Sequence, residues 1–78
     1  MEITFNPDLS IEDFEDGKII MEIESMETVY MELGVFELLA PALEAFREVR
    51  SLFPDIYEED EYQPFVQQLI DMRILLHR

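Results

Sequence analysis

Carboxylates are the residues of this chain whose number and spacing could do chemistry. Its 78 residues include 19 Asp and Glu against 5 Lys and Arg, for a formal net charge of −14. Residues 1–46 hold twelve of these acids and a single base, Lys18, while residues 58–61 form an unbroken run of four carboxylates. Carboxylates accept charge-assisted hydrogen bonds from arginine and lysine. The composition therefore predicts recognition of a basic surface and excludes direct binding of nucleic acid.

The acids on one predicted strand are spaced like the charges on a nucleic acid. Glu22 and Glu24 are two residues apart, which on one face of a strand separates them by about 6.6–6.8 Å. Each strand of DNA carries one charge per about 3.4 Å, so this separation is roughly two phosphate steps. We predict that Glu22, Glu24 and Glu32 share an outward face and mimic a phosphate backbone.

Two tyrosines add an apolar component to the predicted interface. Tyr57 and Tyr62 bracket the acidic run, and aromatic side chains beside carboxylates are typical anchors of protein interfaces. The predicted partner-binding residues are Glu22, Glu24, Glu32, Tyr57, Glu58, Glu59, Asp60, Glu61 and Tyr62.

The acidity has a second explanation that needs no partner. A net charge of about 2–8 suffices for the solubility of a small domain, and repulsion between like charges opposes folding. The excess over that range favours an electrostatic partner, with a merely solvated acidic surface as the alternative.

The sequence offers no convincing catalytic, cofactor or metal site. The single histidine, His77, is the penultimate residue, and no acid is identifiable that would orient it beside a serine nucleophile. Cysteine is absent, which removes thiol chemistry, thiolate metal sites and disulfides. Neither residues 12–17 nor residues 55–61 match a calcium loop, and the only glycines, Gly17 and Gly34, open no phosphate-binding loop. We expect a protein that is not an enzyme and that needs no metal or cofactor.

The same composition bears on cellular location. The N-terminus has neither a basic region nor an apolar segment of a secretory signal, and no apolar run approaches the roughly 20 residues of a membrane span. The lack of cysteine suits a reducing compartment, and an acidic surface is not attracted to anionic lipid. We expect a cytoplasmic protein that does not bind membranes.

The predicted strands lie in the first half of the chain. Alternation of apolar and polar residues predicts a short strand over 2–5 and a clearer one over 18–24, with Ile19, Met21 and Ile23 on one face. Residues 26–33 fit both a strand, with Val29, Met31 and Leu33 on its core face, and a helix. The β-branched residues Thr28 and Val29 beside a tyrosine favour a strand that pairs with 18–24.

A short helix is predicted between the first two strands. Ser10 can cap its start, Leu9 can pack on Phe14 as a hydrophobic staple, and Gly17 is a natural stop. These signals place one or two helical turns over residues 11–16.

Two longer helices are predicted in the second half. Pro41 suits the first turn of a helix that runs to about Phe53; the alternative is a single helix over 35–53 that is kinked at Pro41. Residues 55–62 form an acidic connector, and Pro64 opens a last helix. That helix carries Arg73, His77 and Arg78 near its C-terminus, where the helix dipole favours positive charge.

These elements make up one small α+β domain, in which a short antiparallel sheet packs on two C-terminal helices. We expect a non-enzymatic inhibitor, encoded by a phage or mobile element, that occludes the basic nucleic-acid-binding surface of a host nucleic-acid-processing or defence enzyme. This profile is similar to that of anti-CRISPR proteins and DNA mimics, although no motif assigns the chain to such a family. The alternative is a structural or adaptor subunit that binds a partner, or a second copy of itself, through an apolar helical face.

Overall fold

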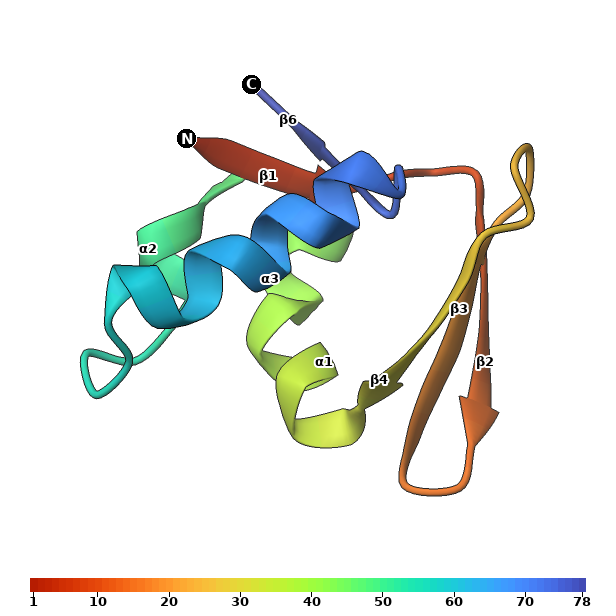
Figure 1. The fold of residues 1–78 in the computed structure, drawn as a ribbon, viewed down its shortest axis with the longest axis horizontal. Helices are drawn as coiled ribbons and strands as arrows, with labels where there is room; N and C mark the ends of the chain where they lie inside the picture. The colour runs from red at the N-terminus through yellow and green to blue at the C-terminus, as the bar shows by residue number, and fades with distance from the viewer.

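The computed structural model describes residues 1–78 and confirms the α+β class, with two antiparallel sheets of three strands and helices in the C-terminal half (Figure 1). The first sheet has the order β5-β1-β6 and the second the order β2-β3-β4. The strands are β1 (Glu2–Phe5), β2 (Leu9–Phe14), β3 (Gly17–Glu22), β4 (Thr28–Glu32), β5 (Arg47–Glu48) and β6 (Leu75–His77). The helices are α1 (Leu33–Leu39), the 3-10 helix η1 (Ala40–Leu43), α2 (Val49–Leu52) and α3 (Glu59–Asp71).

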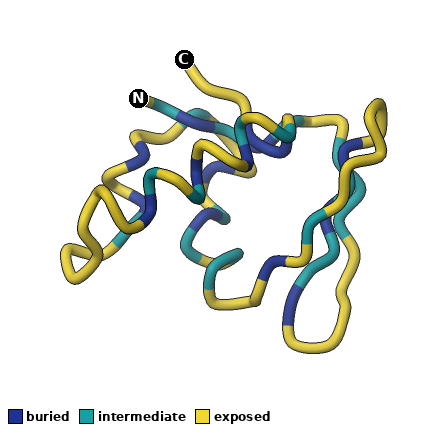
Figure 2. Tube along the Cα trace, viewed as in Figure 1, coloured by how far each residue is buried: buried dark blue, intermediate teal, exposed yellow.

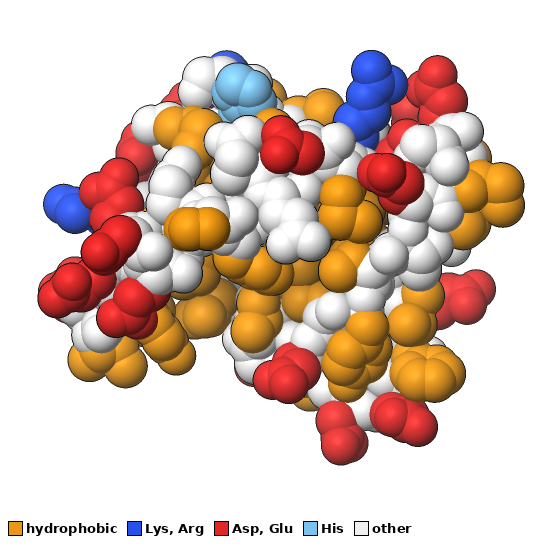
Figure 3. All heavy atoms as spheres, in the orientation of Figure 1, with side chains coloured by type: hydrophobic (Ala, Val, Ile, Leu, Met, Phe, Trp, Pro, Cys, Tyr) orange, Lys and Arg blue, Asp and Glu red, His pale blue; other side chains and the backbone are white.

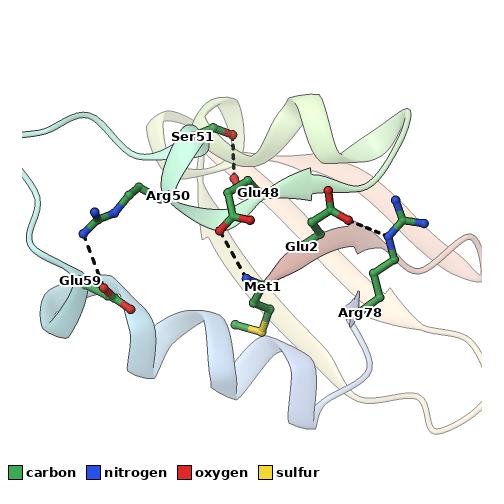
Figure 4. A network of polar contacts seen from close by, with 7 residues as sticks. All are labelled: Met1, Glu2, Glu48, Arg50, Ser51, Glu59 and Arg78. Carbon is green, nitrogen blue, oxygen red and sulfur yellow. Dashed lines mark hydrogen bonds and ion pairs between the residues drawn. The ribbon is translucent and has the colours of Figure 1, made fainter.

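The first sheet brings the two ends of the chain together. Strand β1 lies in the centre, where Phe5 pairs with Leu75 of β6 and Glu2 with Glu48 of β5. Ion pairs close its outer end, because the N-terminal ammonium lies 3.3 Å from Glu48 and the Nε of Arg78 donates to Glu2 at 2.8 Å (Figure 4). The predicted strand over residues 2–5 is confirmed.

The core lies between the first sheet and the helices. Side chains from β1, α1, α3 and β6 are withdrawn from solvent there, as the dark blue segments of the tube show (Figure 2). The fully buried members of this core include Ile3, Leu39, Val66, Leu69, Ile74 and Leu75. The second sheet reaches the same core through Ile20 and Met31, which are 0% and 3% exposed. No helix has the length and apolar character needed to cross a membrane.

The second sheet is a three-stranded meander. Strands β3 and β4 pair from Gly17 with Glu32 to Met21 with Thr28, which confirms a strand in the ambiguous stretch 26–33. Its alternation is as predicted for Met31, which is buried, and Val29, which packs against the core. Leu33 was expected on the same face but begins α1 and is 43% exposed.

The predicted helix over residues 11–16 is wrong, because this segment forms strand β2. Six consecutive residues pair with β3, from Leu9 opposite Glu22 to Phe14 opposite Gly17. This cross-strand ladder outweighs the local capping signals, since a helix of one or two turns has little stability of its own. Glu15, with a φ of 51°, turns the chain between the two strands.

The predicted helix from Pro41 to Phe53 is also wrong, and so is its kinked alternative. The chain forms η1, with Pro41 in its first turn, then the short strand β5 and the single turn of α2. Two contacts to the first sheet break the helical run. Arg47 pairs with Ile3 of β1, and the guanidinium of Arg78 lies 4.2 Å from the ring centre of Phe46.

The last helix starts earlier and ends earlier than predicted. Helix α3 begins at Glu59, so that Pro64 lies inside it, and residues 59–61 belong to its first turn and not to a connector. Its end is set by Arg73, whose φ of 61° places it in the left-handed region. The N–H of Ile74 then donates to the carbonyl of Leu69 at 2.9 Å, as in a Schellman motif. His77 and Arg78 therefore lie on or after strand β6 and not at a helix end.

Candidate binding surfaces

Glu22 does not face solvent. Its side chain is 2% exposed, and its carboxylate accepts the backbone N–H groups of Glu24 at 2.7 Å and of Ser25 at 3.1 Å. The backbone hydrogen bond from Glu24 is the main cause that lowers the pKa of Glu22, against the opposing effect of burial. Glu22 thus holds the turn between β3 and β4, and its predicted place on an outward acidic face is wrong.

The other two acids of that predicted face lie at opposite ends of the sheet. Glu24 is exposed in the β3–β4 turn, where its carboxylate lies 3.9 Å from Arg73. Glu32 is exposed at the far end of β4, opposite Gly17. Because Gly17 precedes Glu22 by five residues on β3, these ends are separated by roughly 16 Å. The structure therefore does not bring Glu22, Glu24 and Glu32 together.

The acidic run at residues 58–61 is exposed and lies at the start of α3. Three of its carboxylates occupy the first helical turn, where they complement the positive end of the helix dipole. Glu59 also lies 3.6 Å from Arg50 of α2 (Figure 4). The run therefore has a local structural role, and its remaining carboxylates are free to meet a partner.

The two tyrosines that flank this run have different environments. Tyr62 is 7% exposed, and its ring stacks on Phe53 with centroids 4.2 Å apart and planes within 1°. It is a core residue. Tyr57 is 44% exposed and lines an apolar groove of about 260 Å³ between α1, α3 and the loop before α3. The other lining residues are Val35, Leu38, Phe53, Glu61, Tyr62 and Phe65.

A second aromatic site, which sequence reasoning missed, lies at the end of the second sheet that holds the β2–β3 turn. The rings of Phe14 and Tyr30 meet edge to face with centroids 6.3 Å apart, and 49% and 43% of these residues are exposed. A Cβ atom on Gly17 would come within 2.8 Å of the Tyr30 ring, so this ring lies over the glycine. The pairing of β2 with β3 creates the site, and the mistaken helix over 11–16 concealed it.

Three carboxylates lie near Tyr30. Burial raises the pKa of Tyr30 most, and the nearby charges of Asp16, Glu15 and Glu32 raise it further. An acidic and aromatic site therefore exists at this end of the sheet, composed partly of residues that the sequence did not single out.

The central strand of the second sheet carries an apolar row on the face turned away from the core. Ile20 points into the core, so the alternation of a strand places Ile19 and Met21 on the opposite face. Ile23 continues that row just past the strand and is 57% exposed. We call the face formed by Phe14, Ile19, Met21, Ile23 and Tyr30 the outer face.

The structure holds no candidate metal site, and comparison with known proteins adds no information on function. No three His, Asp or Glu side chains converge in a way that could hold a metal ion, and His77 is exposed on β6. Comparison with protein-family models, with curated proteins and with solved structures gives no match for this chain. Its exposed surfaces are therefore the basis on which a function can be argued.

Proposed function

We propose that this protein is a non-enzymatic inhibitor that binds, and thereby occludes, the basic nucleic-acid-binding surface of a nucleic-acid-processing or defence enzyme. The observation that carries the proposal is the excess of exposed carboxylates without a cationic partner. Only five carboxylates form ion pairs, those of Glu2, Asp13, Glu24, Glu48 and Glu59. All five pairs are at least partly exposed to solvent, so none offsets much of the repulsion.

The arrangement of the acids supports a groove-blocking mode. Acidic side chains gather at the start of α3 and at the end of the second sheet that holds the β2–β3 turn, and further acids lie around the β3–β4 turn (Figure 3). The longest dimension of the molecule is 31 Å, close to one helical turn of DNA at about 34–36 Å. A basic groove that follows a nucleic-acid backbone would meet both acidic places at once. Arginines and lysines of that groove would then form charge-assisted hydrogen bonds to carboxylates in place of phosphates.

This proposal also implies where the protein acts. An inhibitor of a host defence or nucleic-acid enzyme works in the host cytoplasm and is typical of phages and mobile elements. The mechanism would be steric and electrostatic, like that of anti-CRISPR proteins and DNA mimics. It would require no catalytic residue and no cofactor.

The proposal is tested by capture followed by competition. The immobilised protein is exposed to bacterial lysate at low salt, bound proteins are eluted with a salt gradient, and each is identified by mass spectrometry. The purified target is then assayed for DNA or RNA binding with increasing amounts of the acidic protein. We expect one nucleic-acid enzyme, eluted at moderate salt, that loses its nucleic acid. A target that keeps its nucleic acid bound would refute the mechanism.

Two charge variants show whether the position of the acids matters. The first neutralises the acidic run in the variant E58Q/E59Q/D60N/E61Q. The second neutralises the same number of scattered, exposed acids in the variant D8N/E27Q/E37Q/E44Q. Both change the net charge equally, so a mimic should lose more affinity with the first. Equal losses of affinity in the two variants would mean that the acidic run contributes only through the net charge of the protein.

The apolar groove beside Tyr57 favours a second candidate function. A structural or adaptor subunit would bind an apolar segment of a partner, or of a second copy, between α1 and α3. Six of the seven lining residues are hydrophobic, so such a complex would respond little to salt. An interaction that survives high salt and is lost on changing Val35 to Glu would favour this function over the mimic.

A further inference from the structure

We infer that the outer face of the second sheet is a docking surface for a partner protein that presents arginine or lysine side chains around an apolar ridge. The inference concerns a face that adjoins the acidic end of the second sheet but not the acidic run, and it does not require that the partner bind nucleic acid.

The first step is the apolar content of this face. An antiparallel sheet with one face on the core normally carries polar residues on the other. Strand β3 instead places Ile19 and Met21 outward, followed by Ile23, and none of the three packs against the core. A row of this kind is typical of a surface that another molecule covers.

No part of this chain covers the outer face. All helices lie on one side of the second sheet, and no element lies beyond it (Figure 1). Helix α1 packs on the opposite face, where Ile20 and Met31 are buried. The apolar row is therefore left for a partner.

The second step is the aromatic pair at one end of the row. Tyr30 lies opposite Ile19 on the neighbouring strand, and its ring rests over Gly17 against Phe14. Contacts on two sides hold the Tyr30 ring in place before a partner arrives, so little side-chain entropy is lost on binding. A fixed, half-exposed tyrosine is the kind of side chain that anchors protein interfaces.

The third step is charge, which determines the nature of the partner. Carboxylates border this face: Glu12 lies in register with Ile19, Glu32 lies in register with Gly17, and Asp16 is close enough to the hydroxyl of Tyr30 to raise its pKa. The one base of the sheet, Lys18, lies in register with the buried Met31 and is therefore on the other face. There it pairs with Asp13 and lies 5.4 Å from the ring centre of Phe36. The outer face thus has an apolar centre, an acidic border and no cation.

These charges exclude a second copy as the favoured occupant. Two copies packed through this face would bring like-charged borders together, and each chain carries −14. Like charges across an interface cost several kcal/mol. A guanidinium, by contrast, can stack on Tyr30 and donate to Glu32 at the same time, since it has both a flat face and a fork of donors. Arginine next to aliphatic side chains is therefore the chemistry that fits.

The test is selection of peptides from a random library displayed on phage, with the whole protein as the target. We expect the selected peptides to combine basic residues with aliphatic or aromatic ones. One synthetic peptide is then titrated into the protein and its Kd measured by fluorescence anisotropy. The same peptide should shift the amide NMR signals of β3 and of Tyr30 in the unmodified protein.

Matched variants locate the binding site. Ile23→Ser and Ile56→Ser each remove one exposed isoleucine, at 57% and 80% exposure, but only Ile23 belongs to the outer face. We expect Ile23→Ser and Phe14→Ser to weaken the peptide about tenfold, which corresponds to loss of one anchor side chain, and Ile56→Ser to leave Kd unchanged. The signal shifts do not depend on any variant, so they decide the matter if a variant unfolds.

Three results would overturn the inference. One is selection of peptides without basic residues, or of none at all. Another is a set of NMR shifts that lies away from the outer face. The third is a dimer at physiological salt, detected by analytical ultracentrifugation, that Ile23→Ser dissociates, because it would make a second copy the occupant. None of these results bears on capture by the acidic run, so the two proposals fail separately.

Discussion

The carboxylate of Glu22 accepts a hydrogen bond from the backbone N–H of Glu24 at 2.7 Å. The strand pattern predicts this acid on the outward face, but it instead holds the β3–β4 turn together. The N–H of Ser25 joins the same carboxylate at 3.1 Å. Buried polar groups are tolerated when they are hydrogen-bonded, and every buried side-chain nitrogen and oxygen of this protein has a partner. The relationship removes one charge from the surface and makes the turn dependent on pH.

Glu22→Gln should make the stability of the fold less dependent on pH in the acidic range. The pKa of Glu22 is lowered in the folded state, so its contribution is present above its unfolded pKa, near 4.5, and is lost as pH falls through the lower folded value. Urea midpoints measured from pH 7 downward should therefore fall less steeply for Glu22→Gln than for the unmodified protein. Glu24→Gln changes an exposed acid and serves as the control. Parallel acid limbs for all three proteins would contradict the role given to Glu22.

The two glycines should respond in opposite directions to the same substitution. A Cβ on Gly17 would lie 2.3 Å from the carbonyl oxygen of Met31, a contact that only a backbone shift can relieve. Overpacking of this kind costs about 1–3 kcal/mol, so Gly17→Ala should lower the free energy of unfolding by that amount. Gly34, in α1, has open space around its Cβ position, and Gly34→Ala should raise stability by about 0.5 kcal/mol. Urea denaturation measures both, and a Gly17→Ala protein as stable as the original would contradict the close approach of the Met31 carbonyl to Gly17.

The fold class and three of the strands, β1, β3 and β4, were predictable from local pattern, whereas β2, β5, β6 and the bounds of the helices were not. Alternation over residues 2–5 and 18–24 correctly indicates strands. In β3, however, the buried face is that of Ile20 and Glu22, and the more apolar face is turned away from the core. In residues 9–14 the capping signals favour a helix, but pairing with β3 decides the outcome. In residues 41–53 the helical pattern yields to contacts of Arg47 and Phe46 with the two ends of the chain. Such contacts join residues more than thirty positions apart, and periodicity does not report them.

The candidate surface was predictable in composition but not in place. The exposed run at 58–61 follows directly from the sequence, since four adjacent carboxylates cannot all be buried. The face of each β3 residue depends on which side of the sheet receives the helices. The face with Lys18 and Glu22 is the more polar one, yet it is the face that packs on the core, so the pattern indicated the wrong side. The acidic and aromatic site around Tyr30 required the register of β2 with β3, which the predicted helix had excluded.

Met26→Gly should stabilise the protein although it removes an apolar side chain. Met26 has a φ of 63° and is 67% exposed, so its backbone is strained and its side chain contributes little burial. Glycine adopts this conformation without a steric penalty, and we expect a gain of about 0.5–1 kcal/mol in the free energy of unfolding. Met26→Ala keeps the Cβ and should give no gain. Equal stability of the two variants in urea would show that the left-handed conformation costs nothing in this turn.

Tyr30→Phe should reduce the loss of stability of the fold at high pH. Burial, together with the charges of Asp16, Glu15 and Glu32, raises the pKa of Tyr30 above its ordinary value of 10.0. A group whose pKa is raised by folding contributes stability that is fully present below its unfolded pKa and is lost as pH rises through the folded value. The urea midpoint of the unmodified protein should therefore decline above about pH 10, and that of Tyr30→Phe should decline less.

The absorbance of the phenolate gives an independent readout of the same environment. Glu32→Gln removes one nearby negative charge, so Tyr30 should titrate at a lower pH in this variant than in the unmodified protein. If Tyr30 titrates at the same pH in Glu32→Gln as in the unmodified protein, Glu32 does not act on the tyrosine. That result would weaken the case for arginine at this end of the outer face.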